Sequence, residues 1–210
     1  MTNPNPKTGY TAFCGGRRVA SGALAEVAVR ARSALTRNPG APLLVFDDAT
    51  GAVVEVDLRG SVADVRRRVE EGASGAGAGS TAEAGRDETT RRPGRPRLGV
   101  VAREVTLLPR HWEWLGSQPG GASVALRRLV EEARKANVGA DRRRRSQEAA
   151  YRFMSAVAGD YAGYEEALRA LFAGAADRFH DHIRRWPADV RAYATRMAEG
   201  ALRADEGRSS

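Results

Sequence analysis

The sequence of 210 residues predicts an α+β fold: a small N-terminal ββαββα unit, a flexible Gly-rich linker, a central strand-helix-helix segment and a C-terminal all-α bundle of short helices. Three observations lead to this prediction. Apolar runs of strand length, separated by Gly and Asp turns, occupy much of residues 10–58. Residues 72–79 are almost only Gly, Ala and Ser. From residue 146 onward, apolar residues recur at the three- and four-residue steps of a helix.

In the first unit, residues 1–71, a β-hairpin comes first. Residues 11–14 and 17–20 read as two strands joined at Gly15-Gly16, a dipeptide typical of hairpin turns. Ser21 is expected to cap the helix that follows, because a serine hydroxyl accepts a hydrogen bond from a free helical N–H. The amphipathic stripe of that helix is formed by Leu24, Val27, Ala28, Ala31 and Leu35, and the helix ends near residues 38–40.

Two further strands and a helix complete this unit. Residues 43–46 are a continuous apolar run of the buried-strand type, residues 47–51 form a turn, and residues 53–58 alternate as another strand. We expect Asp47 and Asp48 to accept hydrogen bonds within their own turn, and a magnesium site at these two residues is the less favoured alternative. Ser61 is expected to cap a short helix that carries Val62, Val65 and Val69.

The remaining domain boundaries follow from changes in composition. Residues 72–92 have too few apolar side chains to order themselves, and we expect a disordered linker. Residues 93–136 form the central segment with a basic arm, residues 137–145 a basic linker, residues 146–203 a helical domain, and residues 204–210 a tail. Four short helices are expected in the helical domain, and the last of them begins at Pro187, because proline is favoured at helix starts.

Charge is the most unusual property of the composition. Lys and Arg number 34 against 26 Asp and Glu, which gives a net charge of +8 and a pI near 10.4. Residues 86–97 hold five arginines against two acidic residues, and residues 134–145 hold six basic residues against one. The net charges of these two stretches, +3 and +5, together equal the net charge of the whole chain. Clustering of this kind favours an anionic partner such as nucleic acid. The alternative explanations of the positive charge, which need no partner, are arginine-rich codon usage and solvated linkers.

The first basic stretch contains a Gly-Arg-Pro core within residues 91–97. It resembles an AT-hook, a short arm that lies in the minor groove of A·T-rich DNA. Prolines keep such an arm extended, and arginines are attracted to a narrow, negatively charged groove. The resemblance implies that Arg92, Arg95 and Arg97 contact DNA.

The next stretch has the order strand, helix, glycine turn, helix. Residues 100–107 read as a strand and end at Leu108-Pro109, residues 110–118 as a short helix, and residues 119–121 as a break before a helix capped by Ser123. Leu126, Leu129, Val130 and Ala133 form its apolar stripe. This order resembles the ribbon-helix-helix family of the Arc and MetJ repressors.

The resemblance implies a homodimer whose paired strands enter the major groove of DNA. Val105 and Leu107 would then face the core and Thr106 the groove, while the N-terminus of the second helix, at Ser123, would contact a phosphate. Glu104 on the groove side departs from the pattern, as do Trp112 and Trp114 in one short helix. The alternative is an α/β element of a larger core with Trp112 as a packing residue. The full set of expected DNA contacts is Arg92, Arg95, Arg97, Arg103, Thr106, Ser123, Arg127, Arg142, Arg143, Arg144 and Arg145.

Nearly the whole chain also resembles a bacterial family known only as a domain of unknown function. The likeness is greatest over residues 98–133 (LGVVAREVTLLPRHWEWLGSQPGGASVALRRLVEEA) and residues 148–158. It implies a bacterial cytoplasmic protein, and it brings no activity, substrate or catalytic residue.

Catalytic, metal-binding and membrane signals are not recognised. The chain has one cysteine, Cys14, which fits a reducing cytoplasm, and residues 1–10 do not form a signal peptide. No apolar run reaches the length of a membrane span. His180 and His182 are two apart and would point to different faces of a helix, so no metal or other cofactor is expected. The sequence therefore predicts a cytoplasmic, non-enzymatic, dimeric DNA-binding protein, with no membrane partner and with a regulatory role. The alternatives are a protein–protein adaptor with solvated basic linkers and, less favoured, an enzyme whose site the sequence hides.

Overall fold

The computed structural model describes residues 9–75 and 103–203. They form three strands and eight helices, so the fold is α+β and mostly helical. Two compact units are present: one is built from the described residues 9–75 and 139–203, and the other from residues 103–138. The α+β class is therefore confirmed, while the division into units differs from the predicted one.

The strands of the larger unit form one antiparallel sheet in the order β2-β1-β3. β1 (Tyr10–Cys14) pairs with β2 (Arg17–Gly22) as the predicted hairpin, and Gly15 takes the left-handed φ of 57° in its turn. β3 (Leu43–Asp47) pairs with the other edge of β1. The predicted strand over residues 53–58 is wrong, because the pairing there is limited to a single bridge between Phe46 and Val53 and a hydrogen bond from Val54 N to Val45 O of 2.8 Å.

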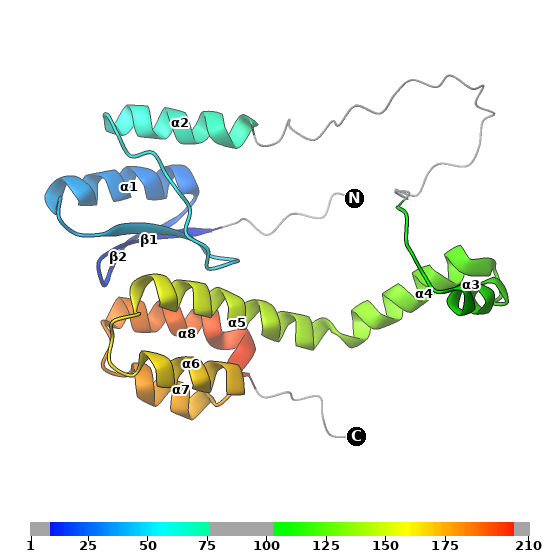
Figure 1. Cartoon of the computed structure of the whole chain (residues 1–210). Helices are drawn as coiled ribbons and strands as arrows, with labels where there is room; N and C mark the ends of the chain where they lie inside the picture. The colour runs from blue at the N-terminus through cyan, green and yellow to red at the C-terminus, as the bar shows by residue number, and fades with distance from the viewer. Residues whose placement is uncertain (1–8, 76–102, 204–210) are drawn as a thin grey trace, which may run out of the picture. The chain divides into compact units, whose positions relative to one another are not determined.

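Helix α1 (Leu24–Arg37) covers one face of this sheet, and α2 (Val62–Gly75) packs against α1 (Figure 1). Their core contains Ala12, Ala20, Val27, Ala31 and Val45. Ser21 does not cap α1, since Ala23 is the N-cap and the Ser21 hydroxyl lies 3.1 Å from Thr11 Oγ1 instead.

The opposite face of the sheet is also buried. Side chains alternate between the two faces of a strand, so Phe13 and Phe46 point away from Ala12 and Val45. They pack into a second core with residues of α5 (Val138–Val157) and α8 (Ala188–Leu202). Figure 1 shows these helices on the side of the sheet opposite to α1. The ring centroid of Phe153 on α5 lies 5.2 Å from that of Phe13 and 5.0 Å from that of Phe46. The predicted domain of residues 1–71 is therefore not separate in its described part, because residues 9–71 share this core with the helices of residues 146–203.

The C-terminal helices follow the predicted order. α5 is followed by α6 (Tyr164–Ala173), α7 (Ala176–Ile183) and α8, and Pro187 is the N-cap of α8. The indole N–H of the buried Trp186 donates to Ala162 O at 3.0 Å, which ties the turn before α8 to the turn before α6. Residues 138–145 are helical, as the first part of α5, where the sequence predicted a linker.

The smaller unit contains α3 (Pro109–Gly116) and α4 (Gly121–Ala136). Gly120 is the N-cap of α4, with a left-handed φ of 82°, so the predicted capping role of Ser123 is wrong: Ser123 lies in the first turn, and its hydroxyl makes no cap hydrogen bond. The described residues 103–108 form no strand. The predicted linker begins inside α2, which runs to residue 75, and the rest of the linker and the AT-hook-like arm lie outside the described residues.

Candidate functional site

Asp48 is the centre of a polar cluster where the sheet meets α8. Its Oδ1 accepts hydrogen bonds from Thr11 Oγ1 at 2.8 Å and from the Tyr193 hydroxyl at 2.7 Å. Arg196 Nη2 lies 3.0 Å from the same oxygen, and the Asp48 side chain is only 19% exposed. Three donors from two elements thus converge on one carboxylate oxygen, which satisfies a largely buried charge.

Local sequence explains how the two neighbouring aspartates come to play different parts. Asp47 Oδ1 accepts from the backbone N–H of Ala49 at 2.8 Å and of Thr50 at 2.9 Å, which is the expected role of a turn aspartate. Asp48, one residue further, points to the opposite side and reaches α8. Tyr193 and Arg196 are three apart on α8 and therefore share its face, with the Arg196 guanidinium 4.5 Å from the centre of the Tyr193 ring.

The hydroxyl of Tyr193 is held in its neutral form. Burial, and then the hydrogen bond to Asp48 and its negative charge, raise the pKa of Tyr193 well above its ordinary value of 10.0. The side chain is 2% exposed. Tyr193 is therefore a permanent hydrogen-bond donor to Asp48 at neutral pH, because deprotonation would place a second negative charge beside the carboxylate.

A basic pocket opens beside Asp48. It has a volume of about 490 Å³ and lies between the turn after β3, the first half of α5 and the second half of α8. Its charged lining comprises Asp48, Arg142, Arg145, Arg196, Glu199 and Arg203. Arginines outnumber acidic side chains here by four to two, so the pocket is suited to an anion.

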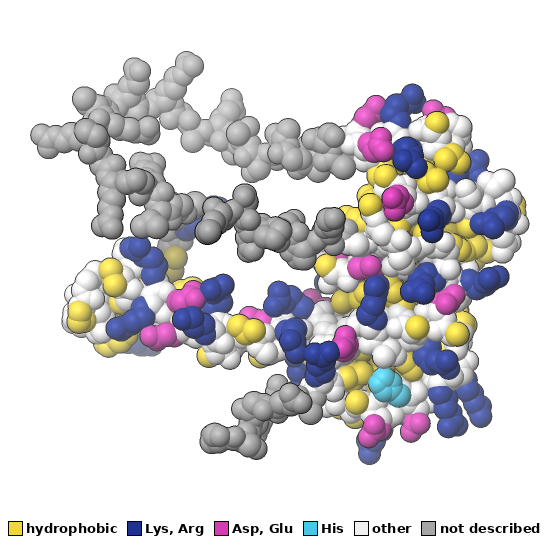
Figure 2. All heavy atoms as spheres, turned by 180° about the vertical axis from the view of Figure 1, so that it is seen from behind, with side chains coloured by type: hydrophobic (Ala, Val, Ile, Leu, Met, Phe, Trp, Pro, Cys, Tyr) yellow, Lys and Arg dark blue, Asp and Glu magenta, His cyan; other side chains and the backbone are white. Residues whose placement is uncertain are grey.

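The four arginines at residues 142–145 do not act as one surface. Consecutive residues of a helix point about 100° apart, so only Arg142 and Arg145 line the pocket. Arg144 forms an ion pair with Asp141, and Arg143 lies against Gly174 at the C-terminus of α6. Figure 2 shows basic side chains gathered around the first turns of α5.

The predicted DNA contacts of the smaller unit are all exposed. Arg103, Thr106, Ser123 and Arg127 are open to solvent, and Arg127 Nε donates to Ser123 O at 3.0 Å along α4. Arg92, Arg95 and Arg97 lie outside the described residues. Among the described residues of this unit, the structure therefore joins two of the predicted contacts, Arg127 and Ser123, by a hydrogen bond.

This unit buries little apolar surface. Leu115 of α3 and Ala125 of α4 are its buried residues among those described. Several large apolar side chains are exposed: Val105, Leu108, Trp112, Trp114, Val124, Leu129 and Val130. In Figure 2, apolar side chains lie among the charged ones on the surface of this unit.

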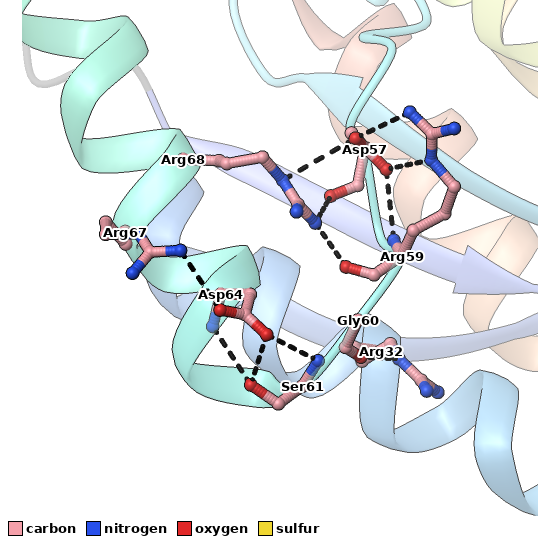
Figure 3. A network of polar contacts seen from close by, with 8 residues as sticks. All are labelled: Arg32, Asp57, Arg59, Gly60, Ser61, Asp64, Arg67 and Arg68. Atoms are coloured by element: carbon pink, nitrogen blue, oxygen red, sulfur yellow. Dashed lines mark hydrogen bonds and ion pairs between the residues drawn. The ribbon is translucent and has the colours of Figure 1, made fainter.

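A second polar network has a structural role. Ser61 and Asp64 form a reciprocal cap at the start of α2, since Ser61 Oγ accepts from Asp64 N and Asp64 Oδ2 accepts from Ser61 N (Figure 3). This confirms the predicted cap. Asp57 accepts from Arg59 Nε at 2.9 Å and pairs with Arg68 of α2 at 3.5 Å. Hydrogen bonds from Arg59 hold the pKa of Asp57 well below its usual range, so this network ties residues 57–59 to α2.

Sequence reasoning missed the Asp48 cluster and the pocket. Asp48 and Tyr193 are 145 positions apart, and a pattern search along the chain does not join such distant residues. One signal was present in the apolar run at residues 43–46, because a strand without alternation is buried on both faces. That reading places a second layer of structure on the sheet.

The fold and the site together define an α+β protein in which a three-stranded antiparallel sheet is covered by helices on both faces, with a basic pocket at one junction. The chain belongs to the family described as uncharacterized protein conserved in bacteria (DUF2239), which it matches over residues 9–198. No curated protein and no solved structure matches it. None of the helices formed by the described residues is long and apolar enough to cross a membrane.

Proposed function

We propose that the chain is a non-enzymatic DNA-binding protein that acts as a homodimer through the unit of residues 103–138, with transcriptional regulation as its role. One observation carries the proposal: the extended residues 103–108 and the helices α3 and α4 leave an apolar surface exposed that two such helices cannot bury by themselves. A second copy in the ribbon-helix-helix arrangement would pair the extended segments and cover these side chains.

The polar residues support contact with DNA in that arrangement. Arg127 extends along the first turns of α4, close to the free N–H groups at the N-terminus of the helix, where a phosphate is favoured. Thr106 and Arg103 are exposed on the extended segment that would enter the groove. The basic arm with Arg92, Arg95 and Arg97 precedes this segment in the sequence and would add minor-groove contacts. Arg142 and Arg145 line the pocket of the other unit, so the DNA surface proposed here does not include them.

The first prediction concerns salt dependence. Each phosphate contact that is lost makes the slope of log affinity against log salt shallower by about 0.9. Arg127→Gln should therefore weaken binding to all DNA sequences and reduce the slope by about one unit per lost contact. Thr106→Ala should change sequence preference and leave the slope unchanged, because a base contact releases no counterion. Fluorescence anisotropy with genomic DNA fragments over a salt series measures both effects.

Arg128→Gln is the matched control for this experiment. It removes the same charge from the next position of α4, where Arg128 pairs with Glu132 at 3.8 Å. Sedimentation of the wild-type chain should show a dimer. Absence of DNA binding at low salt, an equal change of slope in the two variants, or a strictly monomeric protein would contradict the proposal.

The second candidate is a protein–protein adaptor. Trp112 and Trp114 are 43% and 50% exposed on α3, and exposed tryptophans are enriched where proteins meet. An adaptor would bind no DNA in the same titration. Trp112→Ala with Trp114→Ala would then remove the interaction, while Arg127→Gln would have no effect on it.

A further inference from the structure

The basic pocket of the larger unit is distinct from the proposed DNA surface, and it is built by three separate elements. The turn after β3 contributes Asp48 and Ala49, α5 contributes Arg142 and Arg145, and α8 with its C-cap contributes Arg196 and Arg203. At Gly200 the two helices approach so closely that an added Cβ would lie 3.1 Å from Ser146 Cβ. The Ser146 hydroxyl also donates to Met197 O, which fixes the two arginine-bearing helices against each other.

The charges in the pocket are not balanced. Arg196 pairs with Asp48, and Arg203 pairs with Glu199. Among residues 9–75 and 103–203, Arg142 and Arg145 form no ion pair with an acidic side chain, and Arg145 uses its Nε to donate to Asp141 O at 3.1 Å. Two guanidinium groups three positions apart on one helix face repel each other, and an anion between them would relieve that repulsion.

We propose that this pocket binds a small phosphorylated molecule, with its phosphate held between Arg142 and Arg145 of α5 and the arginines of α8 opposite. The planar guanidinium fork matches the oxygens of a phosphate and binds it through two parallel hydrogen bonds. A volume of about 490 Å³ is within the range of ligand pockets and suits a phosphorylated metabolite rather than a bare ion. Ala49, Ala149 and Met197 supply an apolar wall for the part of the ligand that carries no charge.

Asp48 sets the position of the α8 side of the pocket. Its ion pair with Arg196 holds that arginine beside the pocket, and its hydrogen bond from Tyr193 fixes the carboxylate, so Arg196 loses little side-chain freedom on binding. The carboxylate also disfavours an anion that sits too deep. We therefore expect the phosphate at the Arg142–Arg145 side and the uncharged part of the ligand toward Ala49 and Met197.

Isothermal titration of the full chain with inorganic phosphate and pyrophosphate at low ionic strength tests this site. Pyrophosphate should bind more tightly than phosphate, because it engages more of the arginines. Arg142→Gln with Arg145→Gln should weaken pyrophosphate binding by about tenfold or more, the loss expected for one or more charge-assisted hydrogen bonds. The matched control is Arg143→Gln with Arg144→Gln, which removes the same charge from the same helix and should leave binding close to that of the wild type.

Several outcomes would overturn the assignment. The first is that the wild-type protein binds neither anion. The second is that the two double variants weaken pyrophosphate binding equally. The third is that a DNA duplex displaces pyrophosphate in proportion to the charge of the duplex, which would make the pocket a non-specific anion site. Circular dichroism checks that the variants are folded. If the Arg142–Arg145 variant is unfolded, NMR of the wild-type chain decides: pyrophosphate should shift the side-chain Nε–Hε signals of Arg142 and Arg145 and leave that of Arg144 unchanged. The titrations with phosphate and pyrophosphate contain no DNA, so their failure leaves the DNA-binding proposal intact, and the reverse also holds.

Discussion

At the scale of single residues, the most informative contrast is between Asp47 and Asp48. Both follow the same strand, yet Asp47 satisfies the backbone of its own turn while Asp48 accepts bonds from Thr11, Tyr193 and Arg196. The first role is local and could be predicted from the sequence. The second depends on a helix that begins 140 positions later in the chain, and no short-range pattern encodes it.

Tyr193 gives a prediction about pH. Because its pKa in the folded chain is raised above the ordinary value of 10.0, the stabilisation it gives is fully present below pH 10 and is lost as the pH rises through the folded pKa. Tyr193→Phe should cost about 1.5–3 kcal/mol at neutral pH, since it removes a hydrogen bond to a charged group. The difference in the free energy of unfolding between wild type and variant should shrink above about pH 10.

Urea denaturation of both proteins at a series of pH values measures this difference. Thr11→Val is a useful companion variant, because it removes another donor to the same oxygen of Asp48 without removing a group that titrates. Its effect should not depend on pH in this range. A constant difference between wild type and Tyr193→Phe up to high pH would show that the tyrosine hydroxyl is not protected by the fold.

At the scale of elements, the features that depend on neighbouring residues could be predicted from the sequence, whereas those that depend on long-range contacts could not. The hairpin at β1 and β2, the start of α2 at Ser61 and the start of α8 at Pro187 were predicted, because each depends on residues next to each other in the chain. Ser21 and Ser123 were expected to be caps and are not. Their helices begin instead after Ala23 and after Gly120, whose left-handed backbone already turns the chain into the helix.

The turn after β3 gives the prediction at this scale. Gly51 has a left-handed φ of 66°, and a Cβ added there would overlap the backbone carbonyl of Ala149 on α5. Arg152 Nη1 also donates to Thr50 O at 3.1 Å, so this turn is the point where the sheet docks on α5. Gly51→Ala should destabilise the fold by about 2–5 kcal/mol, from backbone strain and from the forced separation of the turn and the helix.

Gly15→Ala is the matched control. Gly15 has a similar φ of 57°, and nothing lies within 4 Å of an added Cβ, so only the cost of the backbone conformation of about 1–2 kcal/mol applies. Thermal unfolding of both variants measures the comparison. Equal destabilisation by the two substitutions would mean that the contact between Gly51 and Ala149 contributes nothing to docking.

At the scale of the whole molecule, the sheet and the C-terminal helices of the larger unit share one core. The sequence predicted the sheet and these helices as separate domains, because residues 72–145 lie between them along the chain and because each part carries its own apolar periodicity. Phe13 and Phe46 of the sheet join the two parts, because both are almost fully buried and pack against Phe153 and Tyr193 of the helices. The separation of segments in sequence therefore does not predict their separation in space.

A shared core predicts that the sheet and the helices unfold together. Phe153 is fully buried and packs against three aromatic rings, those of Phe13, Phe46 and Tyr193, with its centroid 4.5 Å from that of Tyr193, so Phe153→Ala should cost about 3–5 kcal/mol. Hydrogen exchange should show an equal loss of protection for the amides of β1 and of α8. Phe172→Ala is the control, since Phe172 is 52% exposed and its removal should change stability little. If Phe153→Ala lowers protection in α8 and leaves β1 unchanged, the sheet folds independently of the C-terminal helices, as the sequence predicted.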